Sequence, residues 1–375
     1  MEQRRYSATH YGYFESQVSH PVSSAAAHEA ALPDPFLPEL FPLQQASLAE
    51  KLLPLQSALT ASRTLAILLL PDDAVADPLL TLTTYDRLST ALTVAQVTGQ
   101  QRLCRYYASR LAPLPGPDSS RESNIRLAQI TQYARQLASQ PALITAKSVQ
   151  QLEQVGLTAA DIVTFHQIIG FVSYQARVNA VLQAAMSLPL PWLPPQSPPP
   201  DADRALFGLQ ADWQARIESV ELRYASAQQL EALTWCQPQP AFKHIAWLLA
   251  HDAPALYHWA ALQSVLLPAA AGKEADVVTL VVSRINGSPH CFHAVEHPLR
   301  APLYSGIATA QAQADQTERA LMDASALLTR SPERFCAKAL QALRDGGCPE
   351  STLLPLLFHA ALVNWRNRLM QTLGE

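Results

Sequence analysis

The chain has 375 residues and a formal net charge of −4, with 49% hydrophobic and only 15% charged residues. Its length predicts two domains, each large enough to bury a core of its own. The acidic balance and the lack of a basic patch exclude nucleic acid as an expected partner. No apolar run reaches membrane-spanning length, and the N-terminus lacks a signal-peptide core, so we expect no membrane partner either.

The cysteine and charge content narrows further the kind of protein that we expect. Five cysteines, an odd number without a Cys-x-x-Cys pair, argue against a disulfide framework or a structural zinc ribbon. A cytoplasmic location with reduced thiols fits this pattern best. A composition so poor in charge suggests extensive buried surface, and therefore a homo-oligomer.

The first half of the chain reads as an arm followed by helices. Residues 1–35 are rich in Ser, Ala, His and Tyr with little apolar periodicity, which predicts a mobile N-terminal arm. Residues 36–187 form the first expected domain. Apolar periodicity, caps and breakers predict its helices over Leu37–Leu70, Asp86–Leu111 with a break at Gly99, Arg121–Ala138, and from a cap at Thr158, with Asp161 at N3, to about Met186.

A proline-rich stretch over residues 188–202 predicts a stiff, extended linker, and we place the domain boundary there. Residues 203–375 form the second expected domain, in which helices resume at about Asp203. Almost nothing in the chain reads as strand, so the predicted fold class is all-α.

The two halves share a series of landmarks that predicts an internal duplication. The series comprises an aspartate, two glycines and an arginine, which are Asp86, Gly99, Gly156 and Arg177 in the first half and Asp276, Gly287, Gly347 and Arg368 in the second. Two copies of one helical unit would pack about a pseudo-two-fold axis. Cys104 of the first copy is out of step and lacks a proline start, so we interpret that copy as structural.

The stretch from Asp276 to His297 carries the candidate chemistry. Its apolar run favours a helix, because the surrounding sequence is rich in Ala, Leu and Gln. Asn286-Gly287 is a turn pair, Ser288 a good N-cap, and Pro289 suits the first helical position. Cys291 would then lie at N3, where free N–H groups and the helix dipole lower a thiol pKa and favour the nucleophilic thiolate. The competing interpretation is a buried, inert cysteine.

This stretch resembles the active-site segment of the carboxymuconolactone decarboxylase and AhpD-like peroxidase family. In the peroxidase-like branch, an acidic residue precedes the signature Ser-x-x-Asn-Gly-Cys-x-x-Cys-x-x-x-His. The matching positions are Asp276, Ser283, Asn286, Gly287 and Cys291, whereas Ser288 replaces the first cysteine and Val295 the final histidine. The resemblance implies two tandem AhpD-like domains and a peroxidase-related thiol oxidoreductase in which Cys291 attacks the peroxide.

The remaining roles follow from that resemblance. His290 or His293 would protonate the departing hydroxyl, with Asp276 orienting it through water. Because Ser288 cannot form a resolving disulfide, a peroxide or thiol substrate would be turned over with an external thiol reductant. We expect no cofactor and no metal.

Three alternatives stay open. In the first, the chain is a catalytically silent relative that acts as a ligand-binding or assembly module. In the second, proton transfer proceeds without a thiol and is carried out by Asp276, His290, His293 and Glu296. The third is zinc, for which three histidines of one predicted helix, with Cys291 and Glu296, offer ligands: His290, His293 and His297. Two further groups have bland interpretations. His244, His251 and His258 recur at seven-residue spacing, and we interpret them as solvated or interface histidines. The last helix, with His359 and Arg368, would pack near the site as it does in the family.

Overall fold

The computed structural model describes residues 34–38, 46–75, 77–191, 197–208, 213–270 and 272–374. The predicted arm over residues 1–35 therefore lies almost entirely outside the described residues. The all-α prediction is confirmed: apart from one isolated bridge between Ala215 and Gly374, the regular structure of the described ranges is helical. Residues 33–375 form one compact unit, and the domain boundary at 188–202 stays a prediction.

The first half of this unit supplies seven α-helices and two short 3₁₀ turns among the described residues. They are α1 (Ala46–Leu52), η1 (Leu53–Leu55), α2 (Gln56–Leu69), α3 (Thr84–Val97), α4 (Gln101–Leu111), α5 (Arg121–Ser139), η2 (Pro141–Leu143), α6 (Ala146–Gln154) and α7 (Ala159–Ala185). The predicted break at Gly99 and the cap at Thr158 are both confirmed. The Thr158 side chain accepts from the backbone N–H of Asp161, and the Asp161 carboxylate accepts from that of Thr158.

The second half is described from residue 197 and contains more short helices. They are η3 (Arg204–Phe207), η4 (Leu222–Tyr224), α8 (Ala227–Cys236), η5 (Pro240–Phe242), α9 (Ala246–Leu249), η6 (Ala250–Asp252), α10 (Ala253–Ala269), α11 (Lys273–Asn286), α12 (Pro289–His293), α13 (Arg300–Ser305), α14 (Ile307–Gln311), α15 (Gln316–Arg330), η7 (Pro332–Arg334), α16 (Ala337–Asp345) and α17 (Glu350–Leu373).

The expectation of continuous helices from Asp203 is wrong for residues 213–225, which are irregular apart from η4. Hydrogen bonds to a distant part of the chain hold this stretch, instead of the backbone hydrogen bonds of a helix. The Trp213 indole N–H donates to the Met370 carbonyl at 2.9 Å, and the Arg216 N–H donates to the Leu373 carbonyl at 2.8 Å. Trp213 and Arg216 thereby attach this largely exposed stretch to the end of α17.

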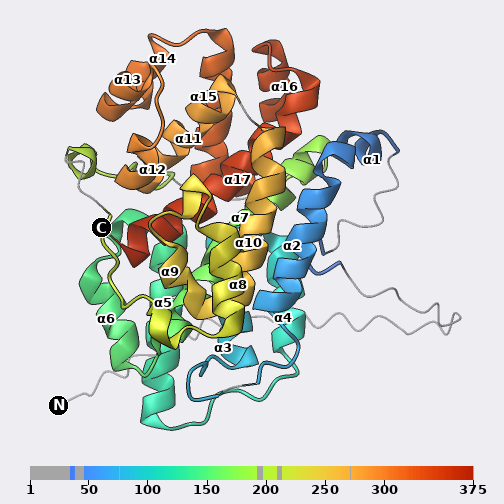
Figure 1. Cartoon of the computed structure of the whole chain (residues 1–375). Helices are drawn as coiled ribbons and strands as arrows, with labels where there is room; N and C mark the ends of the chain where they lie inside the picture. The colour runs from blue at the N-terminus through green and yellow to red at the C-terminus, as the bar shows by residue number, and fades with distance from the viewer. Residues whose placement is uncertain are drawn as a thin grey trace, which may run out of the picture. The chain divides into compact units, whose positions relative to one another are not determined.

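Helices α7 and α17 pack along each other at the centre of the unit (Figure 1). Every residue from Asp161 to Leu182 is buried, and so is every residue from Leu353 to Trp365. A helix that is apolar on all sides belongs in a core with neighbours around it. Here those neighbours include α2, α3 and α5 for α7, and α10, α11 and α15 for α17.

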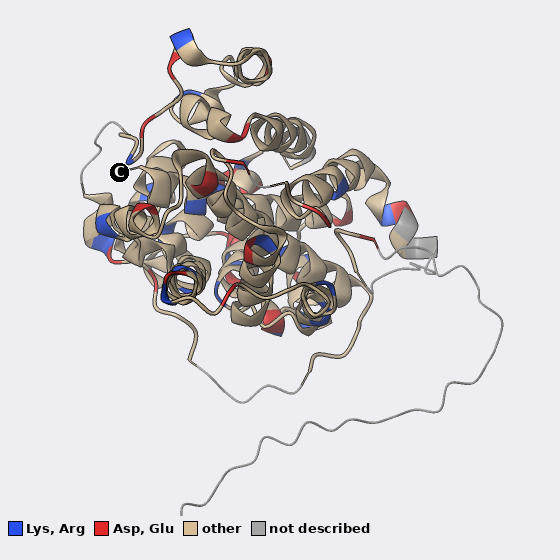
Figure 2. Ribbon diagram, turned by 90° about the horizontal axis from the view of Figure 1, so that it is seen from below, with Lys and Arg blue, Asp and Glu red and all other residues tan. Residues whose placement is uncertain are grey.

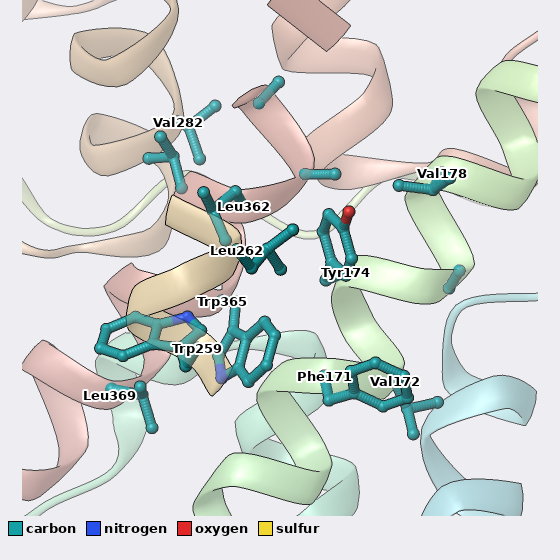
Figure 3. Close-up of a cluster of buried hydrophobic side chains, with 14 of the residues drawn as sticks. Phe171, Val172, Tyr174, Val178, Trp259, Leu262, Val282, Leu362, Trp365 and Leu369 are labelled. Carbon is teal, nitrogen blue, oxygen red and sulfur yellow. The ribbon is translucent and has the colours of Figure 1, made fainter. Parts of the chain in front are cut away.

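Trp365 anchors the α7–α17 contact. Its ring lies 5.7 Å from that of Phe171 and 5.8 Å from that of Trp259, so one α17 side chain joins α7 to α10 (Figure 3). Its indole N–H donates to Gln167 at 3.0 Å. The helices approach closely because α7 has a glycine at this point: a Cβ on Gly170 would lie 1.9 Å from Trp365 Cδ1.

Two arginines make matching contacts between the halves. Arg177 of α7 donates to the carbonyl of Thr329, near the end of α15, at 2.7 Å. Arg368 of α17 donates to the carbonyl of Ala138, near the end of α5, also at 2.7 Å. Each arginine thus satisfies a carbonyl in the last turn of a helix from the other half.

Two surface properties bear on partners. One stretch of the described residues, Glu50–Leu69, is long and apolar enough to cross a membrane by length and composition alone, and 44% of its most apolar window is buried inside the protein. A single helix of this kind is weak evidence for a membrane span. Seen from below, Lys and Arg positions are interspersed with Asp and Glu positions along the described helices (Figure 2).

Replacing Gly170 by alanine tests the close approach at Trp365. The added methyl group should clash with the indole and overpack the core, which typically costs about 1–3 kcal/mol, whereas helix propensity returns only about 1 kcal/mol. We expect a lower urea midpoint for Gly170→Ala, measured by circular dichroism. Gly116→Ala is the matched control, because a Cβ there would meet nothing within 4 Å. Equal stability of Gly170→Ala and the wild type would contradict the packing.

Candidate functional site

The turn between α11 and α12 forms as the sequence predicts. Gly287 ends α11 in the left-handed conformation, with φ of 74°, and its N–H donates to the Ser283 carbonyl at 3.0 Å. A side chain would also find no room here, since a Cβ would lie 2.7 Å from that of Ala142 and 2.8 Å from that of Ala202. Pro289 then begins α12, which places Cys291 at its third position.

Two expectations about α12 are wrong. Ser288 occupies the N-cap position, but its side chain makes no capping bond, and its Oγ is buried without a hydrogen-bond partner. The helix also ends at His293, so His297 does not continue its face. Arg300 explains the early end, because its guanidinium donates to the carbonyls of His293 at 3.3 Å and Val295 at 2.9 Å.

The Cys291 thiol is nearly inaccessible, with the residue 2% exposed. A segment that we call the cover (residues 201–208) packs along the α11–α12 turn. The Ala202 N–H donates to the Ile285 carbonyl at 3.1 Å, and Arg284 donates to the Ala202 carbonyl at 2.6 Å. The Phe207 ring lies 5.0 Å from that of Phe292. A substrate therefore reaches the thiol only if the cover moves or the substrate is very small.

His293 takes part in holding the cover. Its Nε2 lies 3.0 Å from the Phe207 carbonyl oxygen. Since a carbonyl can only accept, this nitrogen carries a proton and donates it to the Phe207 carbonyl oxygen of the cover. The structure therefore assigns His293 a positioning contact, and its predicted role as the acid stays a prediction.

Asp276 and Cys291 are not brought together along the chain. Asp276 is half-buried in the first turns of α11, whereas Cys291 follows the far end of that helix. At 1.5 Å per residue, Asp276 lies about 15 Å along the axis from Asn286. The single turn of α12 is too short to return Cys291 to that level.

Ser283 and Asn286, the other motif positions, form a buried polar network with α17. Asn286 Nδ2 donates to Asn364 Oδ1 at 3.0 Å and to Asn367 Oδ1 at 3.2 Å, and Asn367 Nδ2 donates to Ser283 Oγ at 3.1 Å. Arg368 donates to Asn364 Oδ1 at 3.2 Å. These contacts fix the angle between α11 and α17, and so they explain the motif residues structurally.

His290 lies in a basic environment beside Cys291. Its ring is 5.2 Å from that of His244 in an edge-on arrangement. Burial, together with the charges of Arg366 and His244, lowers the pKa of His290 to about 4. The imidazole is therefore neutral near pH 7. Its expected role as the acid stays a prediction.

His359 of α17 lies deeper in the same region. Its Nε2 is 2.8 Å from Thr279 Oγ1, and because that hydroxyl donates to the Ala275 carbonyl, the histidine must donate to it. Its Nδ1 is then an acceptor, and this atom is buried without a partner. Burial and the charge of Arg366 lower the pKa of His359 to about 4.

Arg366 is the residue that sequence reasoning missed. It lies seven residues after His359, two turns along the same face of α17, and α12 packs against that helix. The spacing is visible in the sequence, but nothing in the sequence shows that α12 is its neighbour.

The described residues contain no group of three or more His, Cys, Asp and Glu side chains arranged to hold a metal. The histidines considered for zinc diverge, since His293 contacts the cover and His297 lies 3.8 Å from the Glu318 carboxylate. Two large clefts of the described surface, of about 540 Å³ between α15 and α16 and about 510 Å³ beside the start of α3, are lined by other residues than Cys291.

Comparisons with known proteins add no relative. No family model matches the chain, and neither a curated protein nor a solved structure matches it significantly. The AhpD-like resemblance thus rests on the motif alone and stays a prediction.

The buried, neutral His359 predicts an acid-sensitive fold. The unfolded histidine titrates near a pKa of about 6.5, whereas the folded one has a pKa of about 4. As the pH falls from 7 to 5, the unfolded state takes up the proton, so this residue alone should lower the free energy of unfolding by about 2 kcal/mol. For a His359→Gln variant, the free energy of unfolding should fall by about 2 kcal/mol less between pH 7 and pH 5. Urea titration at each pH measures this difference. Parallel pH profiles for the variant and the wild type would refute the assignment.

Proposed function

We propose that the chain is a peroxidase-related thiol oxidoreductase with Cys291 as its nucleophile. The observation that carries this proposal is the position of Cys291 in the first turn of α12, directly after the neutral imidazole of His290. The free N–H groups at the start of a helix stabilise an anionic side chain in its first turn, and this supports a Cys291 thiolate.

The proposed reaction balances with one external reductant. The Cys291 thiolate attacks the outer oxygen of a hydroperoxide, the O–O bond breaks, and the thiol becomes a sulfenic acid while the protonated alkoxide leaves as an alcohol. A first external thiol condenses with the sulfenic acid and releases water. A second external thiol then exchanges with this mixed disulfide, returning the Cys291 thiol and leaving the reductant oxidised. Ser288 explains why both thiols come from outside.

We further propose that the halves are tandem copies of one AhpD-like unit, in a cytoplasmic homo-oligomer. The matching Arg177 and Arg368 contacts support the duplication. In the first copy, α4 begins without a proline, and burial raises the pKa of Cys104. A thiol with a raised pKa is a poor nucleophile at neutral pH, which supports the structural role proposed for this copy.

One observation favours a second candidate, the catalytically silent binding or assembly module. Cys291 is 2% exposed and Asp276 lies at the far end of α11. A cysteine that stays covered would serve only in packing.

Peroxide turnover distinguishes these two functions. With dithiothreitol as reductant, the wild type should consume cumene hydroperoxide or hydrogen peroxide faster than the uncatalysed rate, and Cys291→Ser should abolish the excess. Cys236→Ser is the matched control, because Cys236 is fully buried and lies in another helix, α8. Equal rates for the wild type and Cys291→Ser would leave the binding module as the better account.

A further inference from the structure

Three neighbouring helices form one outer surface of the unit, which we call the α10 face. Helix α10 lies in the middle, packed against α2 on one side and α8 on the other (Figure 1). The inner side of α10 packs against α17. The outer side of α10 is therefore the centre of a surface that is three helices wide.

The outer side of α10 is an uncharged stripe. Its residues share spacings of three and four and are not fully buried: Pro254, Tyr257, His258, Ala261, Ser264 and Val265. None of the 17 residues of α10 is Lys, Arg, Asp or Glu. Burial lowers the pKa of His258, so this imidazole is neutral near pH 7. The flanking helices add only Arg63 on α2 and Glu231 on α8.

Two aromatic side chains of the α10 face are partly exposed to water. Trp235 of α8 is 46% exposed and Tyr257 of α10 is 39% exposed, and their rings lie 6.1 Å apart. A hollow of about 150 Å³ lies between the two helices, with Glu231, Tyr257 and His258 in its wall. The cores of protein interfaces are enriched in tryptophan and tyrosine and depleted of charge. The α10 face therefore has the composition of an interface.

The size of the hollow and the charges around the face favour a protein as the occupant. Pockets for small molecules are typically about 300–1,000 Å³, so the hollow suits a single side chain. A membrane surface is held by basic side chains that meet anionic lipids. The cations of α1 and α2 are already paired, Lys51 with Glu350 at 2.6 Å and Arg63 with Asp34 at 2.8 Å.

The α10 face is large enough for a specific dimer. Helix α10 is about 25 Å long, and three helices at a spacing of about 9 Å are about 27 Å wide. Because α2 and α8 are shorter than α10, the face covers on the order of 500 Å². Two copies would together bury on the order of 1,000 Å², which is the size expected of a specific interface at its lower end.

We propose that the α10 face binds the same face of a second copy of this chain, about a two-fold axis near Ala261. In such a contact, residues near the axis meet their own copies, so a lysine or glutamate there would face a like charge. The uncharged stripe avoids this repulsion. Tyr257 and Val265 lie four residues on either side of Ala261. With the two α10 helices antiparallel, Tyr257 of one copy lies over Val265 of the other.

This inference locates the interface of the homo-oligomer proposed above, and it rests on that part of the proposed function. It is independent of the chemistry of Cys291. Peroxide turnover tests the thiol, whereas the molecular mass in solution tests the interface. The two proposals can therefore fail separately.

Size-exclusion chromatography with light scattering measures the mass of the full chain at several concentrations. We expect the wild type to associate into dimers or a multiple of them, and Tyr257→Glu to weaken association about tenfold or more, as for the loss of an aromatic anchor. Ile125→Glu is the matched control, because Ile125 is an exposed apolar residue of α5, outside the α10 face. It should associate like the wild type. A monomeric wild type would overturn both the interface and the homo-oligomer. Association of Tyr257→Glu like that of the wild type would overturn the interface alone.

Opposite charges at Ala261 test the two-fold axis itself. Ala261→Glu and Ala261→Lys should each associate more weakly than the wild type, because like charges meet across the axis. An equal mixture of the two should associate again, because glutamate then meets lysine. Both variants should keep the helical circular dichroism spectrum of the wild type, since both introduced residues favour helix. A mixture that associates no better than either variant would overturn the two-fold contact. Binding of the wild type to phosphatidylserine vesicles, lost in Tyr257→Glu, would assign the face to a membrane instead.

Discussion

The packing of α7 against α17 is the constraint on which the rest of this structure depends. Each helix is buried on all sides over most of its length, so neither can be stable without the other and the layer around them. The contact is specific because Gly170 admits the Trp365 ring, whose indole N–H finds Gln167. The Arg177 and Arg368 contacts then tie each central helix to the last turn of a helix in the opposite half.

The candidate site is a consequence of where α17 lies. This helix holds α11 through the asparagine network of Asn286, Asn364 and Asn367, and α11 in turn presents the turn at Gly287. The same helix carries His359 and Arg366, and it packs against α12. The cover closes the outer side of the turn, which makes access to Cys291 a matter of how readily Ala202 and Phe207 detach.

Local signals in the sequence were sufficient for most of the helices. The Thr158–Asp161 box begins α7, Gly287 ends α11, and Pro289 begins α12, because each depends on backbone conformation or on partners a few residues away. The site could be predicted less well. Nothing near Ser288 reveals that its hydroxyl is buried without a partner, and nothing near His297 reveals that Arg300 ends the helix at His293. Arg366 escaped notice because its importance comes from a contact between helices far apart in the chain.

The most direct test of the central claim is the alkylation rate of Cys291 as a function of pH, followed by mass spectrometry in the native protein. The other four cysteines serve as internal controls. An ordinary thiol titrates near a pKa of about 8.5. The proposed nucleophile should be labelled selectively, with a midpoint at least about one pH unit lower. Slow labelling of Cys291, like that of the buried Cys236, would contradict an activated thiolate and leave the fold with a covered, structural cysteine.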